Sequence, residues 1–331
     1  MSGSDLAYHL RVNKAIERNL FVELLARVGR VRNISDYEYI GFGGPFLEDY
    51  KALHAGLRMS KMLSIESDPN TYLRQQFNRP AAFVDLRDKH SSEFFRTHNF
   101  SDAGTVVWLD YTGQAELKSQ LDEFRQVVSQ LDTFDVAKIT LQASPDKLGS
   151  GDKKPHELPA YRVGVLNEKL AEYVPPTLTK DDMTSKTYPL TLQACVRNAL
   201  STLSARAGAR YFQILSSFVY KDGQTMLTIT GMVLEAHNDQ RLEQFLNLSR
   251  LRDWPFVNMN WSAPQSISVP SLSAKERMRL DERLPISAGP DANPGRLLEQ
   301  HLGYLPGCVA ADLANYARFY RAYPHFSRVV L

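Results

Sequence analysis

Residues 37–45 read Tyr37-Glu38-Tyr39-Ile40-Gly41-Phe42-Gly43-Gly44-Pro45, and this stretch decides the interpretation of the chain. Its aromatic and β-branched first part predicts a strand over about 37–42. The glycines predict a tight turn, because glycine adopts positive φ and lets a ligand approach the backbone closely. A helix expected over about 46–54 would point its N-terminal amides at such a ligand. A tight turn without a ligand would use the same glycines.

Short apolar runs and helical segments alternate after this turn. Such alternation predicts a parallel sheet with helices on both faces, joined by right-handed crossovers. We therefore predict a doubly wound α/β domain. Its further strands are expected at 62–66, 82–85, 105–110 and 135–141, with helices at about 115–131 and 190–206.

Two later β-rich runs, 211–220 and 225–234, are separated by a turn that contains Asp222-Gly223. An Asp-Gly pair between such runs is a strong hairpin signal. The mostly parallel sheet is therefore expected to have seven strands and to end in an antiparallel hairpin.

The expected domains follow from these elements. Residues 1–34 form an N-terminal helical extension, with an amphipathic helix over about 6–29. Residues 35–236 form the α/β domain, which carries a turn-rich insertion at 144–187. Residues 237–331 have a different composition, with several prolines and short helical runs, and form either a C-terminal extension or a module for a substrate or a protein partner.

The composition narrows the class of protein. The chain has 331 residues, 43% of them hydrophobic, and a formal net charge of +2. This charge indicates no strong non-specific attraction to nucleic acid or to a membrane. No uninterrupted apolar run of about 18 residues predicts a membrane span. Cys195 and Cys308 are expected to be buried and reduced, no metal-ligand spacing is visible, and a cytoplasmic protein is expected.

Acidic residues end three of the predicted strands. Glu66 closes the strand at 62–66, Asp85 closes 82–85, and Asp110 closes 105–110. Ligands of open α/β sheets bind outside the carboxyl ends of the strands, and an acid after the second strand can hold ribose hydroxyls. Because parallel strands end at one edge, the three acids should gather beside the glycine turn.

This order of parts resembles a class I S-adenosylmethionine-dependent methyltransferase over residues of about 35–235. The antiparallel hairpin distinguishes this fold from a nicotinamide-binding domain, whose sheet does not end in such a hairpin. The resemblance implies S-adenosylmethionine as cofactor. It implies that Gly41, Phe42, Gly43 and Gly44 border the cofactor, that Glu66 binds ribose, that Asp85 lies near adenine, and that Asp110, Tyr111, Ser144 and Pro145 face cofactor or acceptor.

The implied chemistry is in-line transfer of a methyl group, which depends on alignment of the reactants. Asp110 is the first candidate for a general base, Tyr111 would orient or stack on the acceptor, and His9 is a second candidate base. An oxygen acceptor is expected, with nitrogen as the less favoured choice. The segment Asp110-Tyr111-Thr112-Gly113 lacks the Asp/Asn-Pro-Pro-aromatic motif of base-amino methyltransferases, which argues against amino methylation of adenine or cytosine in DNA. Residues 8–15 and 42–50 are similar to bacterial proteins described as O-methyltransferases.

Two alternatives remain open. Tyr39 stands where the family usually has an acid, and Pro45 stands where a third glycine is frequent. These departures favour a catalytically atypical subunit of a multiprotein system, for example in phage defence.

The other alternative is a protein that binds or modifies nucleic acid. It rests on a basic helix face with Arg11, Lys14 and Arg18 and on the aromatic, basic segment 316–326. The helical spacing of the aromatic residues in that segment instead predicts a stripe that faces the core.

Overall fold

The computed structural model of the chain describes residues 11–114, 116–201, 203, 210–235, 239–286 and 293–324. His9 lies outside these residues. The chain divides into two compact units. The larger contains Val22–Val219 and Gln224–Gln265, and the smaller contains Leu6–Phe21, Tyr220–Gly223 and Ser266–Leu331. The smaller unit takes up the C-terminal residues from Ser266 onward.

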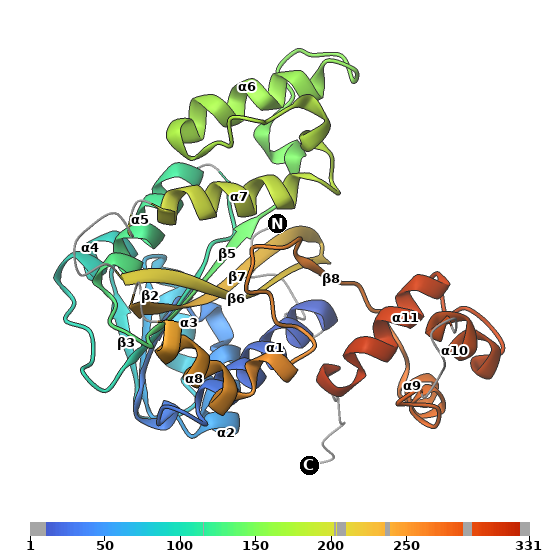
Figure 1. The fold of residues 1–331 in the computed structure, drawn as a ribbon, viewed down its shortest axis with the longest axis horizontal. Helices are drawn as coiled ribbons and strands as arrows, with labels where there is room; N and C mark the ends of the chain where they lie inside the picture. The colour runs from blue at the N-terminus through green and yellow to red at the C-terminus, as the bar shows by residue number, and fades with distance from the viewer. Residues whose placement is uncertain are drawn as a thin grey trace. The chain divides into compact units, whose positions relative to one another are not determined.

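A single mixed sheet organises the chain (Figure 1). Strands β1 to β5 pair in parallel with their neighbours, and β5 pairs antiparallel with β7. The sheet order is β3 (Val84–Asp88), β2 (Lys61–Glu66), β1 (Glu38–Gly41), β4 (Thr105–Asp110), β5 (Val136–Gln142), β7 (Gln224–Glu235), β6 (Arg210–Asp222) and β8 (Gln265–Ile267). The doubly wound fold and the hairpin are confirmed. The sheet has eight strands rather than seven, because short β8 pairs with β6.

Helices cover both faces of the sheet within the larger unit. One face packs its apolar side chains against α4 (Ser91–Thr97), α5 (Leu117–Gln130) and α7 (Tyr188–Ser201). The opposite face meets α2 (Glu48–Leu57) and α3 (Pro69–Asn78), which follow β1 and β2. Neighbouring residues of a strand point to opposite faces, so each strand end can present side chains to both layers.

The insertion at 144–187 is largely helical. It starts with a 3-10 turn at Pro145–Leu148 and continues with α6 (Leu158–Leu170). Leu166 and Leu170 of α6 join the core beside α5 and α7. The insertion is therefore anchored to the sheet domain by apolar packing.

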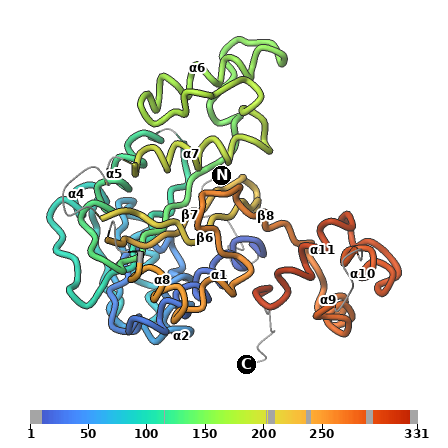
Figure 2. Tube along the Cα trace, in the orientation of Figure 1, coloured from blue at the N-terminus to red at the C-terminus, as the bar shows by residue number. Residues whose placement is uncertain are grey.

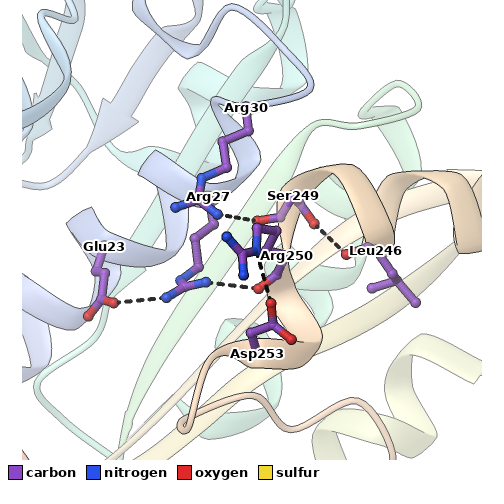
Figure 3. Close-up of polar contacts among 7 residues, drawn as sticks. All are labelled: Glu23, Arg27, Arg30, Leu246, Ser249, Arg250 and Asp253. Carbon is purple, nitrogen blue, oxygen red and sulfur yellow. Dashed lines mark hydrogen bonds and ion pairs between the residues drawn. The ribbon is translucent and has the colours of Figure 1, made fainter.

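Two arginines cap the C-terminus of α8 (Asp239–Ser249). Arg27 belongs to α1 (Val12–Val28), and Arg30 lies just after that helix. Arg27 Nη1 donates to the Arg250 carbonyl at 2.8 Å, and Arg30 Nη1 donates to the Ser249 carbonyl at 3.3 Å (Figure 3). Arg250 has a φ of 54°, and its own side chain bonds Asp253. The last carbonyls of a helix lack intrahelical partners, and cations near them are favourable. These contacts fix α8 on the larger unit.

The smaller unit joins three stretches that are distant in sequence. Asp222, at the tip of the hairpin, accepts hydrogen bonds from the Lys14 amide at 2.7 Å and from Asn13 Nδ2 at 3.0 Å. Asn13 Oδ1 in turn accepts from the Val269 amide at 3.0 Å, and Asn19 Nδ2 donates to the Ala322 carbonyl at 2.8 Å. The hairpin tip therefore caps the first turn of α1.

Three helices complete this unit, α9 (Ala274–Asp281), α10 (Pro294–Leu302) and α11 (Ala310–Phe319), and Figure 2 traces their path. Gly295 lets α10 cross close to α11, because a Cβ there would lie 1.9 Å from the Ala310 carbonyl oxygen. Tyr316, Phe319 and Tyr323 are buried, which confirms the core-facing stripe for these three residues.

Three predictions about individual side chains have different outcomes. Lys14 is buried, so the basic face of the first helix is not wholly solvent-exposed. Cys195 is buried as predicted, whereas Cys308 is only partly buried.

Within the described ranges, no helix is long and apolar enough to cross a membrane. Those ranges also contain no group of three His, Cys, Asp or Glu residues placed to hold a metal ion.

Candidate functional site

The glycine turn connects β1 to α2 at the carboxyl edge of the sheet. Gly43 and Gly44 have φ angles of 69° and 52°, a region that favours glycine. A Cβ on Gly43 would lie 2.5 Å from the Leu47 side chain, and one on Gly41 would lie 2.8 Å from the Tyr39 hydroxyl. A Cβ on Gly44 would meet nothing within 4 Å. Packing inside the protein therefore requires Gly41 and Gly43, whereas Gly44 borders open space.

Gln75, a buried residue of α3, holds the middle of the turn. Its Nε2 donates to the Phe42 carbonyl at 2.8 Å and to the Gly44 carbonyl at 3.0 Å. Its Oε1 accepts a 3.0 Å hydrogen bond from the Ser64 hydroxyl on β2. One side chain thus joins three consecutive elements, and a glutamine in a polar helix gives no sequence signal for this role.

The other carbonyls of the turn also have donors. The Tyr50 hydroxyl lies 2.8 Å from the Gly41 carbonyl oxygen, the Leu47 amide donates to Gly43 at 3.1 Å, and Asn78 Nδ2 donates to Pro45 at 2.8 Å. Every carbonyl from residue 41 to residue 45 therefore accepts a hydrogen bond within the protein. A turn whose carbonyls are all engaged has a fixed shape before any ligand arrives.

Tyr39 and Asp49 form a buried pair beneath the turn. The Tyr39 hydroxyl donates to Asp49 Oδ2, and its ring packs edge-on against Tyr50 with centroids 4.9 Å apart. Burial raises the pKa of Tyr39 well above its usual value, and the charges of Asp49 and Asp110 act in the same direction. Tyr39 is therefore a neutral hydrogen-bond donor. Asp49 of α2 places a carboxylate next to Tyr39, the position at which the resembled family usually has an acid.

Glu66 lies at the carboxyl end of β2, as predicted. Its Oε1 accepts from the amides of Ser67 and Asp68, both at 2.8 Å. Burial raises the pKa of Glu66, and the charges of Asp68 and Asp88 add to this rise, while the two amide bonds lower it. The backbone thus fixes the carboxylate plane through one oxygen. Asp68 caps α3 through the Thr71 amide, so Glu66 is not the capping residue.

The placement of Asp85 at a strand end was wrong. Strand β3 runs from Val84 to Asp88, so Asp85 is its second residue and pairs in register with Leu63. Asp85 is exposed and forms an ion pair with Arg87. The short apolar run 82–84 suggested an early end, but the strand continues through Leu86 and three charged positions, Asp85, Arg87 and Asp88. Asp88, in register with Glu66, is the acid at the carboxyl edge.

Asp110 is the last residue of β4 and Tyr111 follows it, so their side chains point to opposite layers. Asp110 is half-buried on the Tyr39 side, where its charge acts on the Tyr39 hydroxyl. The Tyr111 ring packs against Phe42 of the glycine turn, with centroids 5.4 Å apart, and joins the core on the α4–α5 side. Burial raises the pKa of Tyr111 well above its usual value, and the charge of Glu123 raises it further. Tyr111 therefore presents its ring, rather than an ionisable hydroxyl, to the edge.

Glu123 of α5 is a further acid that the sequence pattern did not indicate. Burial raises its pKa, whereas the hydroxyls of Ser91 and Tyr111 and the charge of His90 lower it. Glu123 lies in an amphipathic helix with many polar residues, so its position alone gave no signal. Its neighbours come from the ends of β3 and β4, which places this carboxylate close to the same edge.

Ser144 and Pro145 follow β5 and start the insertion. Gln114, from the loop after β4, donates to the carbonyls of Gln142 and Ser144, the latter at 3.3 Å. The Tyr111 amide donates to the Thr140 carbonyl at 3.1 Å. The loops after β4 and β5 are therefore tied together, and the structure brings the predicted residues of both loops to one edge.

Comparison with protein families gives a match to one described as "Putative O-methyltransferase" over residues 6–331. The chain belongs to this family. Membership confirms the resemblance to methyltransferases and the prediction of an enzyme of that class. Comparison with curated proteins finds no match.

Solved structures of several methyltransferases are similar to the chain. The N-methyltransferase NodS from Bradyrhizobium japonicum is 10% identical, with a TM-score of 0.36, covering 66% of this chain and 97% of that one. The O-methyltransferase TomG from Streptomyces achromogenes is 14% identical, with a TM-score of 0.36, covering 65% and 79%. A 16S rRNA adenine methyltransferase from Catenulisporales acidiphilia is 12% identical, with a TM-score of 0.33, covering 61% and 88%. Similarity this distant does not select an acceptor.

Proposed function

We propose that the protein binds S-adenosylmethionine at the carboxyl ends of β1, β2 and β4 and transfers its methyl group to an oxygen of an acceptor. The observation that carries this proposal is the glycine turn with its five engaged carbonyls, open at Gly44 and next to Glu66. A rigid turn and a fixed carboxylate suit a ligand with a methionine end and a ribose.

The residues of the site fit this cofactor in separate ways. Glu66 would accept a ribose hydroxyl through Oε2, since both amide bonds use Oε1. Asp49, held by Tyr39, supplies negative charge near Gly41 for the methionine ammonium group. Asp88 would take the place on the adenine side that was predicted for Asp85. When bound, the cofactor supplies an electrophilic methyl group on sulfur.

Asp110 would take the proton of the acceptor. It lies at the end of β4, one residue before the ring that packs on the glycine turn. A hydroxyl acceptor needs a base within hydrogen-bond distance when its proton is lost in the transfer step. The remaining contribution of the protein is alignment of the acceptor oxygen with the methyl group.

Calorimetric titration with S-adenosylhomocysteine tests the cofactor site. We expect Glu66→Ala to weaken binding about tenfold or more, because a hydrogen bond to a charged group contributes about 1.5 to 3 kcal/mol. Asp85→Ala is the matched control, since Asp85 is exposed on the neighbouring strand and pairs with Arg87. Absence of binding by the wild type at millimolar ligand refutes the proposal.

A second proposal concerns a protein partner of the smaller unit. Five large apolar side chains are exposed there, namely Met278, Leu297, Tyr304, Leu305 and Val309. Exposed apolar patches are typical of interaction surfaces. Binding of S-adenosylhomocysteine without methyl transfer to hydroxyl or amine acceptors would favour a subunit of a larger assembly over an independent enzyme.

A further inference from the structure

Helix α3 of the larger unit exposes two large apolar side chains that lie one turn apart. Leu73 is 61% exposed and Phe77 is 91% exposed. Residues spaced i and i+4 are neighbours on the surface of a helix, so these side chains form one continuous apolar strip. Gln75, on the inward side of the same helix, bonds the glycine turn. These bonds fix the rotation of α3 and keep the strip turned outward.

The residues around the strip are uncharged. Pro69, Asn70 and Gln76 are exposed on the same side of the helix. The outward side of a surface helix is usually charged or polar, whereas depletion of charge around an aromatic residue is typical of the centre of a protein–protein interface. We define the α3 face as Pro69, Asn70, Leu73, Gln76 and Phe77.

Opposite charges lie at the two ends of the α3 face. Asp68 caps the N-terminus of α3 and is exposed, and its hydrogen bonds with Thr71 lower the pKa of its carboxyl group. Arg79 follows the C-terminus and is also exposed. A second α3 laid antiparallel across the face brings each Asp68 toward Arg79 of the other copy. A parallel arrangement instead places like charges together, which is unfavourable.

We propose that the α3 face is a contact between two copies of this chain, related by a two-fold axis that crosses α3 between Leu73 and Phe77. A two-fold contact uses the same patch on both copies. The α3 face meets this condition, because Phe77 of each copy then packs on Leu73 of the other while the end charges pair. A helix of 10 residues is about 15 Å long. Its face limits the contact to less than about 1,200 Å² in total, which is the range of weak interfaces.

Sedimentation of the full chain between about 1 and 500 µM tests this contact, because a weak interface gives a micromolar dissociation constant. We expect a monomer at the lowest concentration and a dimer at the highest. Phe77→Ala and Leu73→Ala should each weaken association about tenfold or more, since a few central side chains carry most of the energy of an interface. Leu248→Ala is the matched control, because Leu248 is 54% exposed on another helix of the larger unit, and it should leave association unchanged.

Charge variants test the antiparallel orientation. Asp68→Asn keeps a capping residue for α3, and Arg79→Gln removes the opposite charge. Each should weaken association about two- to fivefold, as expected of an exposed ion pair. The double variant should associate no more weakly than the single variants, because both changes break the same pair. Additive effects overturn the orientation.

Two results overturn the contact itself. A wild type that stays monomeric at every concentration leaves a different macromolecule as the occupant of the α3 face. A dimer that persists unchanged in Phe77→Ala and Leu73→Ala uses another surface. Circular dichroism should show the same fold and thermal stability in these variants as in the wild type, because the side chains removed are exposed.

Discussion

The Tyr39 hydroxyl donates a hydrogen bond to the carboxylate of Asp49, and this pair lies directly beneath Gly41. Related methyltransferases usually have an acid at the position of Tyr39. Here a carboxylate from the following helix reaches the same region through a tyrosine. The departure at Tyr39 therefore does not by itself indicate a lost site, and the pair can be tested directly.

Tyr39→Phe should lower the free energy of unfolding by about 1 to 3 kcal/mol, because it removes a donor from a buried carboxylate. The ring contact with Tyr50 should persist. Urea unfolding measures the change. Asp49→Asn keeps an acceptor for the Tyr39 hydroxyl and should cost less stability, while weakening S-adenosylhomocysteine binding. Equal stability losses in the two variants would contradict this explanation.

Gln75→Ala should loosen the glycine turn. It removes donors from the Phe42 and Gly44 carbonyls, and we expect a loss of about 2 to 4 kcal/mol in stability. Affinity for S-adenosylhomocysteine should fall by about tenfold or more, because a mobile turn must be ordered on binding. Gln76→Ala, one residue later on the exposed side of α3, is the control and should change neither quantity. Wild-type affinity in Gln75→Ala would show that the clamp does not shape the site.

Stability should depend on pH through Asp135. This buried carboxylate accepts hydrogen bonds from the amides of Thr105 and Asp132, both at 2.8 Å. Burial raises its pKa to about 6, above the ordinary value of an unfolded chain. The folded state therefore binds the proton more tightly, and this contribution to stability falls as pH rises from about 4 to 6, by about 3 kcal/mol at most.

Asp135→Asn isolates this effect. The variant should be less stable at pH 4.5, because an amide group accepts only through its oxygen and cannot serve both backbone donors. The stability gap to the wild type should narrow as pH rises to 7.5, since only the wild type acquires a buried charge. Urea unfolding at several pH values measures the gap, and a gap independent of pH would contradict the prediction.

Gly295→Ala should destabilise the smaller unit by about 1 to 3 kcal/mol or more, because the added methyl group would clash with the backbone of α11. Thermal unfolding monitored by circular dichroism measures the loss. Gly164→Ala is the matched control, since a Cβ there meets nothing within 4 Å. Alanine in that helix interior should raise stability by about 0.5 to 1 kcal/mol. Equal effects at both positions would exclude helix crowding as the cause.

The sequence predicted features that depend on local residue order. The strand before Gly41, the acid at Glu66 and the hairpin around Asp222-Gly223 each follow from turn chemistry and periodicity. The prediction for Asp85 failed because β3 extends through charged residues after its apolar start. Strand ends are set by pairing with the neighbouring strand, which a single sequence does not display.

The parts of the site that were missed depend on contacts between elements. On α3, Gln75 is fully buried, whereas Phe77 is 91% exposed. Hydrophobicity predicts the opposite, a buried Phe77 and an exposed Gln75. The Phe42 and Gly44 carbonyls of the turn require a hydrogen-bond donor at position 75, and this requirement decides which residue is buried. Glu123 was missed for a similar reason, since its neighbours come from loops after two different strands.

The hydrogen bonds of Asn13, Asp222 and Ala322 have a consequence for biosynthesis. The smaller unit combines segments from early, midway and late along this sequence. The sheet can form as its strands emerge, but the first half of α1 must wait until Val269 and Ala322 have been synthesised before all its partners exist. A circular permutant that places residues 11–21 after residue 324 would shorten that wait, and its refolding rate would report how far assembly of this unit limits folding.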